Sequence, residues 1–193
     1  KSFIESVRDF ADGIEDEDLQ KDIQGFIRQE ADHTREHARY NATLNAQGVD
    51  VDFHTSLTAK PVELTRRYLS PKRNLARTVG MEHITAILSD LALSDPRVLK
   101  NADEQVRRIW NWHAIEEIEH KAVAFDVYKT VARGSYLTRI LGMIQVSITF
   151  PLHSLLIMRH MFEVDGLRNR GRLWMKGLWW LYGPKGVFSG LLP

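Results

Sequence analysis

Apolar residues recur every three or four positions along most of this chain, which is the period of an α-helix. No segment alternates apolar and polar residues as a half-buried strand would. Residues 1–14 therefore predict a first helix, and Asp16 or Asp18 is a suitable N-cap for a long second helix. That helix is expected to end near Gln47, before Gly48.

Prolines and polar turns divide the rest of the chain. Residues 48–60 predict a loop, and Pro61 and Pro71 suit the first turns of two helices, the second of which ends near Leu93. The next long helix is expected to begin at Asp103 and to end near Gly134. The whole pattern predicts an all-α protein.

Carboxylates and imidazoles interrupt the apolar faces of three of these helices. They are Glu30, His33 and His37 on one helix, Glu82 on a second, and His113, Glu117 and His120 on a third. At about 100° per residue, each group falls on one face of its helix, together with apolar residues above and below it. Burying such groups without partners costs too much free energy, so the pattern calls for a metal or for specific hydrogen bonds.

Three further positions lie near these groups, and His37 within them has two alternative roles. Glu119 points to the opposite side of its helix and is expected in solvent, whereas Glu116 lies at the edge of the face and suits either environment. His83 lies about 100° away from Glu82 and is the weaker candidate. His37 could be a ligand or a donor that orients a carboxylate.

The spacing of these residues favours a metal pair. A lone buried histidine usually makes one core hydrogen bond, and a lone glutamate is usually a surface charge. Two Glu-x-x-His motifs with an aligned third glutamate are much harder to obtain by chance. This is the ligand pattern of ferritin-like di-iron and di-manganese proteins. We therefore expect a single domain over residues 1–193, with the fold of a ferritin-like four-helix bundle and additional C-terminal helices. Residues 1–133 are expected to form the metal-binding bundle, and residues 134–193 the apolar, basic C-terminal helices.

Two strings carry a resemblance to a known family. Trp112–Tyr128 (WHAIEEIEHKAVAFDVY) and Glu30–Asn41 (EADHTREHARYN) resemble the bacterial family of predicted metal-dependent hydrolases, over nearly the whole chain. The resemblance implies a metal-dependent hydrolase.

The last ligand helix is also similar to that of the di-iron arylamine N-oxygenases. His113, Glu117 and His120 match their His-x-x-x-Glu-x-x-His motif, and His113 matches the histidine that these enzymes add to the ferritin-like set. Glu30 with His33 matches their first Glu-x-x-His, and Glu82 matches the single glutamate of the third helix. His37 goes beyond the pattern.

The resemblance also requires a glutamate from the first helix. Glu5 is the nearest candidate, but it lies about 200° from both Phe3 and Val7 around the helix. The family typically carries this glutamate just ahead of the pair that is Phe3-Ile4 here, so we expect it before Lys1, in a longer natural chain.

Nitrogen and carboxylate ligands without sulfur suit two transition-metal ions, with iron expected first and manganese or zinc as alternatives. Glu30, Glu82 and Glu117 are the expected catalytic residues. The first hypothesis is an oxidase or oxygenase that activates dioxygen on a small, lipophilic substrate. The alternatives are a metal-dependent hydrolase that uses activated water, and a non-catalytic metal-binding protein.

Composition narrows these functions further. The chain has no cysteine, which excludes a thiolate zinc site, and its net charge of +1 gives no broad basic stripe for nucleic acid. The charge is divided unevenly, because residues 133–193 carry 8 basic and 2 acidic side chains and the remainder carries 18 and 23.

Residues 140–158 contain no charged side chain and are flanked by Arg139 and Arg159. This run predicts either a buried fifth helix of the bundle or a membrane-contacting segment, the latter favoured by nearby Trp174, Trp179 and Trp180 among basic residues. The expected location is the cytoplasm, with residues 140–182 available to the inner-membrane surface or to a second copy of the chain.

Overall fold

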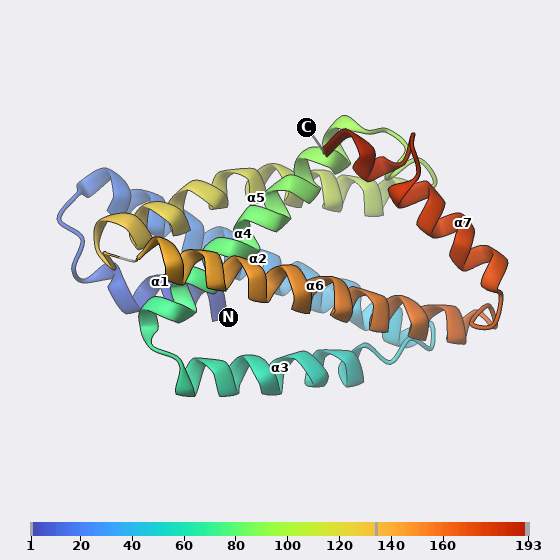
Figure 1. Ribbon diagram of the computed structural model, residues 1–193, viewed down its shortest axis with the longest axis horizontal. Coiled ribbons are helices and arrows are strands. Elements are labelled where there is room, and N and C mark those ends of the chain that lie inside the picture. The colour runs from blue at the N-terminus through green and yellow to red at the C-terminus, as the bar shows by residue number, and fades with distance from the viewer. Residues whose placement is uncertain (1, 134, 192–193) are drawn as a thin grey trace.

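The computed structural model describes residues 2–133 and 135–191, and within these ranges it contains helices and no strand (Figure 1). The predicted all-α class is confirmed. In chain order the elements are α1 (Ser2–Ala11), α2 (Glu17–Ala46), α3 (Val51–Tyr68), α4 (Pro71–Ser94), α5 (Glu104–Thr130), α6 (Tyr136–Val164), α7 (Gly171–Tyr182) and the short 3₁₀ helix η1 (Val187–Leu191).

The hydrophobic core lies between α1, α2, α4 and α5. Its largest fully buried apolar side chains include Val7 from α1, Ile23 and Phe26 from α2, Leu75 from α4 and Val127 from α5. These residues come from the apolar stripes that the sequence predicts. The four helices thus form the bundle that holds the polar cluster described below.

The helix ends follow the predicted caps. Asp16 accepts hydrogen bonds from the backbone N–H groups of residues 18 and 19, and Asp103 accepts one from Gln105. Ser70 caps α4, with Pro71 in its first turn. The predicted end of α5 at Gly134 lies outside the described residues, and α5 ends at Thr130.

The prediction of a loop at residues 48–60 is wrong, because α3 begins at Val51. Asp50 caps it by accepting the N–H of Phe53 at 2.9 Å. Pro61 lies inside this helix rather than in its first turn. The ring removes one backbone hydrogen bond, and α3 tolerates this loss on the outside of the bundle, where Figure 1 shows it.

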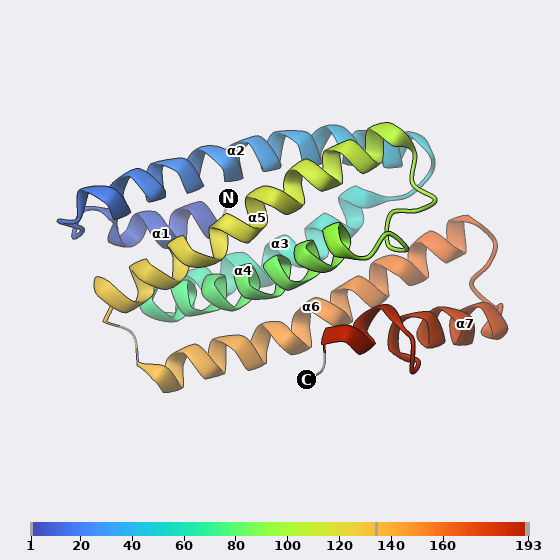
Figure 2. The ribbon, with the colours of Figure 1, turned by 90° about the horizontal axis from the view of Figure 1, so that it is seen from above.

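Helix α6 crosses in front of α4 in Figure 1 and lies beside it in Figure 2, and the two helices pack together. A Cβ atom on Gly142 would lie 2.7 Å from the carbonyl oxygen of Ala76, so only glycine allows this approach. Near the other end of α6, His160 Nε2 accepts the N–H of Asp50 at 3.1 Å. Contacts at these two places hold α6 against the bundle.

Only Gly142 and Val146 of α6 are buried, so the reading of 140–158 as a buried helix of the bundle is wrong for this chain by itself. The run is helical, as predicted, but most of it lies on the outside. Helix α6 is the one described helix that is long and apolar enough to cross a membrane by length and composition, and 11% of its most apolar window is buried.

Candidate metal centre

Four buried side chains from α2 and α5 meet in the middle of the bundle. Glu30 and His33 come from α2, and Glu117 and His120 from α5; one ligand atom of each lies within 4.8 Å of the others. The Glu-x-x-His spacing puts both members of each pair on the inner face of their helix. The two predicted motifs therefore meet across the bundle.

The atoms that converge are the Nδ1 atoms of both imidazoles and the Oε1 atoms of both carboxylates. His33 Nδ1 lies 3.5 Å from Glu30 Oε1 and 3.4 Å from Glu117 Oε1. His120 Nδ1 lies 3.3 Å and 4.0 Å from the same two oxygens. Nitrogen and oxygen donors alternate around a common centre, as in a carboxylate–imidazole metal site.

The outer nitrogens of both histidines have partners that orient the rings. His33 Nε2 lies 2.8 Å from Glu116 Oε2, and His120 Nε2 lies 3.2 Å from Gln29 Oε1. An Nε2–H that donates to these oxygens leaves the Nδ1 lone pair directed at the centre. Second partners of this kind are what metal-binding histidines normally have.

Glu82 enters the same region from α4 and is 0% exposed. Its Oε2 lies 3.8 Å from His120 Nδ1, and neither carboxylate oxygen has a hydrogen-bond partner among the described residues. Burial, reinforced by the charges of Glu117 and Glu30, holds the pKa of Glu82 well above its usual value of 4.5. A buried carboxyl without partners is a site that a cation would satisfy.

The charges of the central groups are strongly coupled. Burial disfavours the carboxylate of Glu30, but the facing imidazoles of His120 and His33 outweigh it and lower the pKa of Glu30 to about 2. Burial likewise opposes charge on His33, but bonds to Glu117, Glu30 and Glu116 raise its pKa to about 10. In the metal-free protein a proton on His33 thus takes the place that a cation would take.

His113 and His37 continue the cluster outward. His113 Nε2 lies 3.4 Å from Glu117 Oε1, and its ring centroid is 4.1 Å from that of His33. The ring of His37 lies 4.9 Å from that of His113. Burial lowers the pKa of both histidines, to about 4 for His113, so both are neutral near pH 7 and can donate a lone pair. They line the way out of the centre, with His37 farther from it.

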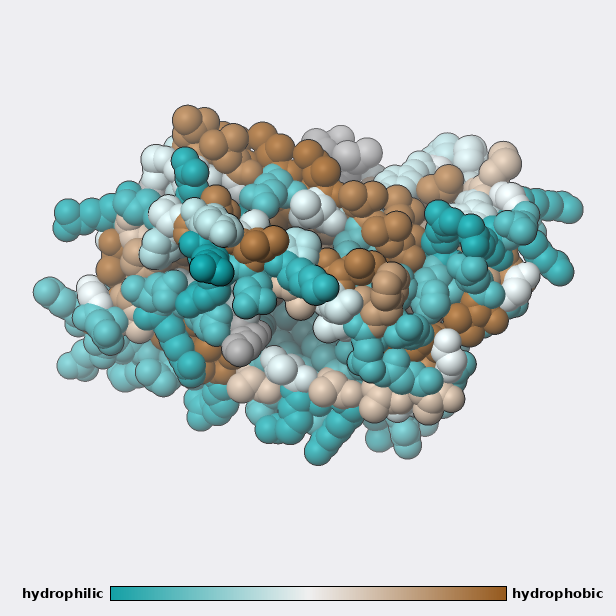
Figure 3. Space-filling view, turned by 90° about the horizontal axis from the view of Figure 1, so that it is seen from below, coloured by the Kyte–Doolittle hydropathy of each residue, from teal (hydrophilic) through white to brown (hydrophobic). Residues whose placement is uncertain are grey.

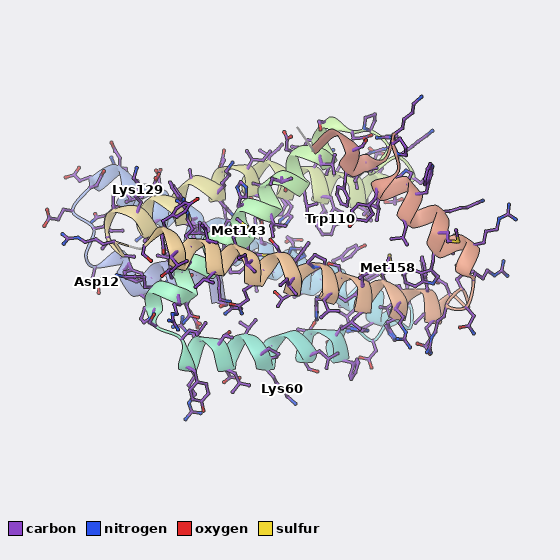
Figure 4. The ribbon with its side chains drawn as sticks, in the orientation of Figure 1. Asp12, Lys60, Trp110, Lys129, Met143 and Met158 are labelled. Atoms are coloured by element: carbon purple, nitrogen blue, oxygen red, sulfur yellow. The ribbon has the colours of Figure 1, made fainter. Side chains whose placement is uncertain are left out.

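A narrow cavity of about 10 Å³ lies beside these two histidines. Tyr40, Trp110 and Trp112 contribute its aromatic walls, and Figure 4 labels Trp110 on α5. The volume is about that of one water-sized probe, so the cavity is not a preformed substrate pocket.

The other acidic and histidine candidates from the sequence lie outside the group of converging ligand atoms. Glu119 is exposed, as predicted, and accepts a hydrogen bond from Gln29 at 3.3 Å. Glu116, left open by the sequence, is the partner of His33. His83 lines a different groove, with Lys121. Glu5 forms an ion pair with Arg66 of α3 at 3.0 Å and does not reach the centre.

Gln29 was missed as a partner of His120. The available signal was its position four residues before His33, on the same face of α2. Spacing alone could not show that it reaches a histidine of another helix.

The donor set fits metal ions. The Nδ1 atoms of two oriented histidines meet three carboxylates, those of Glu30, Glu82 and Glu117. In this buried region little but a cation can compensate the free-energy cost of burying these groups. Such a set is able to bind two metal ions.

The match to known families agrees with this site. The family model described as predicted metal-dependent hydrolase matches residues 1–193. The chain belongs to this family. No curated protein and no solved structure matches the chain.

Proposed function

We propose that this chain is a metal-dependent hydrolase with a two-metal centre. The observation that carries the proposal is the pair of oriented histidines, His33 and His120, whose Nδ1 atoms face the carboxylates of Glu30 and Glu117 while their Nε2 atoms are held from outside. The family description supports hydrolysis over the oxygenase reaction that the ligand pattern alone ranks first.

In this proposal Glu30, His33, Glu82, Glu117 and His120 would hold the metal ions. When bound, such ions acidify water and make it a nucleophile for an ester or amide bond. His113 lies beside Glu117 and is an additional nitrogen donor on the side of the cavity. Iron, manganese and zinc all suit this set.

The surrounding residues have separate roles. Glu116 and Gln29 are positioning residues that keep the imidazole rings in one tautomer. His37, with the aromatic walls of the cavity, borders the approach to the centre. We propose that a small substrate enters on this side after Trp110 or Trp112 moves, because the closed cavity has room for about one water.

One observation favours a second function, a di-iron oxidase or oxygenase. The ring of His113 packs 4.1 Å from that of His33, so the centre has more nitrogen donors than the two Glu-x-x-His motifs alone provide. This is the feature that resembles the arylamine N-oxygenases.

Metal replacement separates the two functions. The chain is stripped with a chelator, reloaded anaerobically with zinc, manganese or ferrous iron, and assayed on aryl esters and anilides and for oxygen uptake. Hydrolysis with zinc or manganese, lost in His120→Ala and kept in Glu119→Gln, is the expected result. Oxygen uptake by the ferrous form without hydrolysis by any form would replace the hydrolase with the oxygenase. No metal retention by the reloaded chain would overturn both.

A further inference from the structure

Helix α6 presents a continuous apolar strip to the outside of the molecule. Its residues follow one another at steps of three or four, and their exposure ranges from 47% to 65%: Leu137, Leu141, Ile144, Ile148, Leu152 and Leu155. From first to last the strip runs roughly 27 Å along the helix. Figure 3 shows an apolar band on the upper edge of the molecule, where α6 lies, above a mainly hydrophilic surface.

Helix α7 extends this apolar surface. None of its 12 residues is buried, and its main packing is against η1. Trp179 is 70% exposed, and Met175, Trp180 and Tyr182 are exposed beside it. Both helices lie on the same side of the molecule in Figure 2. Tryptophan and tyrosine prefer the interface between lipid and water.

The charges around this surface are basic. Residues 133–193 carry 8 basic and 2 acidic side chains. Arg139 and Arg159 flank the uncharged run, and Arg170, Arg172 and Lys176 form no salt bridge among the described residues. Apolar area bordered by unpaired cations complements an anionic lipid surface.

A groove of about 570 Å³ at the N-terminal end of α6 has the same character. Its lining includes the apolar Val79, Phe125 and Met143 and the basic Lys121 and Arg139, with no carboxylate. The guanidinium of Arg139 lies 5.1 Å from the ring of Phe125 and 5.2 Å from that of Tyr136. The groove combines a hydrocarbon-like wall with positive charge, as an anionic lipid requires.

The packing of α6 determines how it can meet a bilayer. Its inner side touches the backbone of α4 at Ala76, next to Arg77. If α6 crossed the membrane in this fold, α4 with Lys72, Arg73 and Arg77 would enter the hydrocarbon, which is costly. The arrangement therefore suits a helix that lies in the plane of the interface.

A second copy of the chain is a poorer occupant. A two-fold dimer would pair the strips antiparallel or parallel, so Arg139 of one copy would approach either Arg159 or Arg139 of the other. Like charges at both ends of such an interface oppose association.

We propose that α6 and α7 dock in the plane of an anionic lipid bilayer and hold the metal centre next to the membrane surface. The basic groove receives the head group of an anionic lipid at the N-terminal end of α6. The proposal does not depend on the chemistry at the metal centre.

Vesicle flotation with the full chain tests this surface. The probes are vesicles of phosphatidylcholine alone and of phosphatidylcholine mixed with phosphatidylglycerol. The chain should float with the mixed vesicles, bind pure phosphatidylcholine at least tenfold less, and lose binding at high salt. The double variant Ile144→Glu/Ile148→Glu should bind the mixed vesicles at least tenfold less. A matched double variant on exposed positions of α3, Leu57→Glu/Leu64→Glu, should bind normally.

A charge-reversal pair tests the basic part. Arg170→Glu should weaken binding to the mixed vesicles severalfold, whereas Lys60→Glu, on α3 (Figure 4), should not. Circular dichroism checks that each variant folds. Equal binding to both vesicle types, or unchanged binding in the α6 variant, would overturn the proposal. A dimer by light scattering that Ile144→Glu/Ile148→Glu dissociates, with no vesicle binding, would assign the strip to a second copy instead.

Discussion

At the scale of single residues, the centre depends on the direction of lone pairs. His33 and His120 each have one nitrogen held by an oxygen outside the centre and the other directed inward. Helical spacing predicts that these side chains share a buried region, because the residues fall on one face. It could not predict which nitrogen points inward, since that depends on Glu116 and Gln29 across the bundle.

Helical phase makes a direct prediction for α5. Glu117→Ala should remove one or both metal ions, because Glu117 Oε1 lies within 3.4 Å of both His33 and His113. Glu119→Ala, two residues along the same helix, should keep full occupancy since its side chain is exposed. Elemental analysis of the reloaded proteins measures this. Equal loss of metal from both variants would contradict the assigned site.

Glu116 should affect the metal through His33. Removing its carboxylate in Glu116→Ala releases the ring and should lower metal affinity about 10–100-fold. Glu116→Gln should lose less, because the amide oxygen still accepts the Nε2–H. Titration against a competing chelator gives the affinities, and circular dichroism shows whether the fold is kept. Wild-type affinity in the alanine variant would show that Glu116 does not orient the ligand.

Glu82 should make the metal-free protein less stable as the pH rises. Its pKa is raised above 4.5 by burial, so the folded chain keeps a proton that the unfolded chain loses. Its contribution to the free energy of unfolding therefore falls from about pH 4.5 upward, until the folded pKa is passed. The variant Glu82→Gln has no titrating carboxyl at this position, so its free energy of unfolding should lack this decrease.

The stability gain of chelator-treated Glu82→Gln over wild type should consequently grow as the pH rises above 4.5 in urea titrations. Exposed Glu119→Gln should show no such trend. A constant difference across this range would mean that Glu82 ionises normally in the folded protein.

At the scale of the elements, the sequence predicts α2, α4 and α5 well, because each has a clear cap and a long apolar stripe. It fails at α3, since Pro61 suits a helix start and is unfavourable inside a helix, where it removes a backbone hydrogen bond and crowds the carbonyl one turn earlier. It also fails at α6. A run of apolar residues without charge cannot show whether its partner is the bundle or something outside it.

The crossing of α4 and α6 should be sensitive to a single methyl group. Gly142→Ala places a Cβ atom 2.7 Å from the carbonyl oxygen of Ala76, so the helices must move apart, at a cost of about 1–3 kcal/mol. Gly177→Ala in α7 meets no atom within 4 Å and should be neutral or slightly stabilising. Urea unfolding compares the two. Equal stability of both variants would contradict the close crossing.

At the scale of the whole molecule, α4 connects two surfaces with different chemistry. Glu82 faces the centre between α2 and α5, whereas Ala76 and Gly80 face α6 on the other side. The centre is thus one helix away from the proposed membrane face. The charges follow the same division, since residues 133–193 are basic and the remainder of the chain is acidic.

Metal binding should stabilise the bundle as a unit, because the proposed ligands come from three helices that share the core. At about a hundredfold excess over the dissociation constant, bound metal adds about 2.7 kcal/mol to the free energy of unfolding. For a chain of this size the melting temperature should rise by roughly 5–10 °C. Hydrogen exchange should slow in α2, α4 and α5 around Glu30, Glu82 and His120 and stay unchanged in α7, which contributes no ligand.

Glu117→Ala should lose most of the increase in melting temperature, and Glu119→Ala should keep it. An increase of the same size in both variants, or protection spread evenly into α7, would mean that the metal binds elsewhere on the chain.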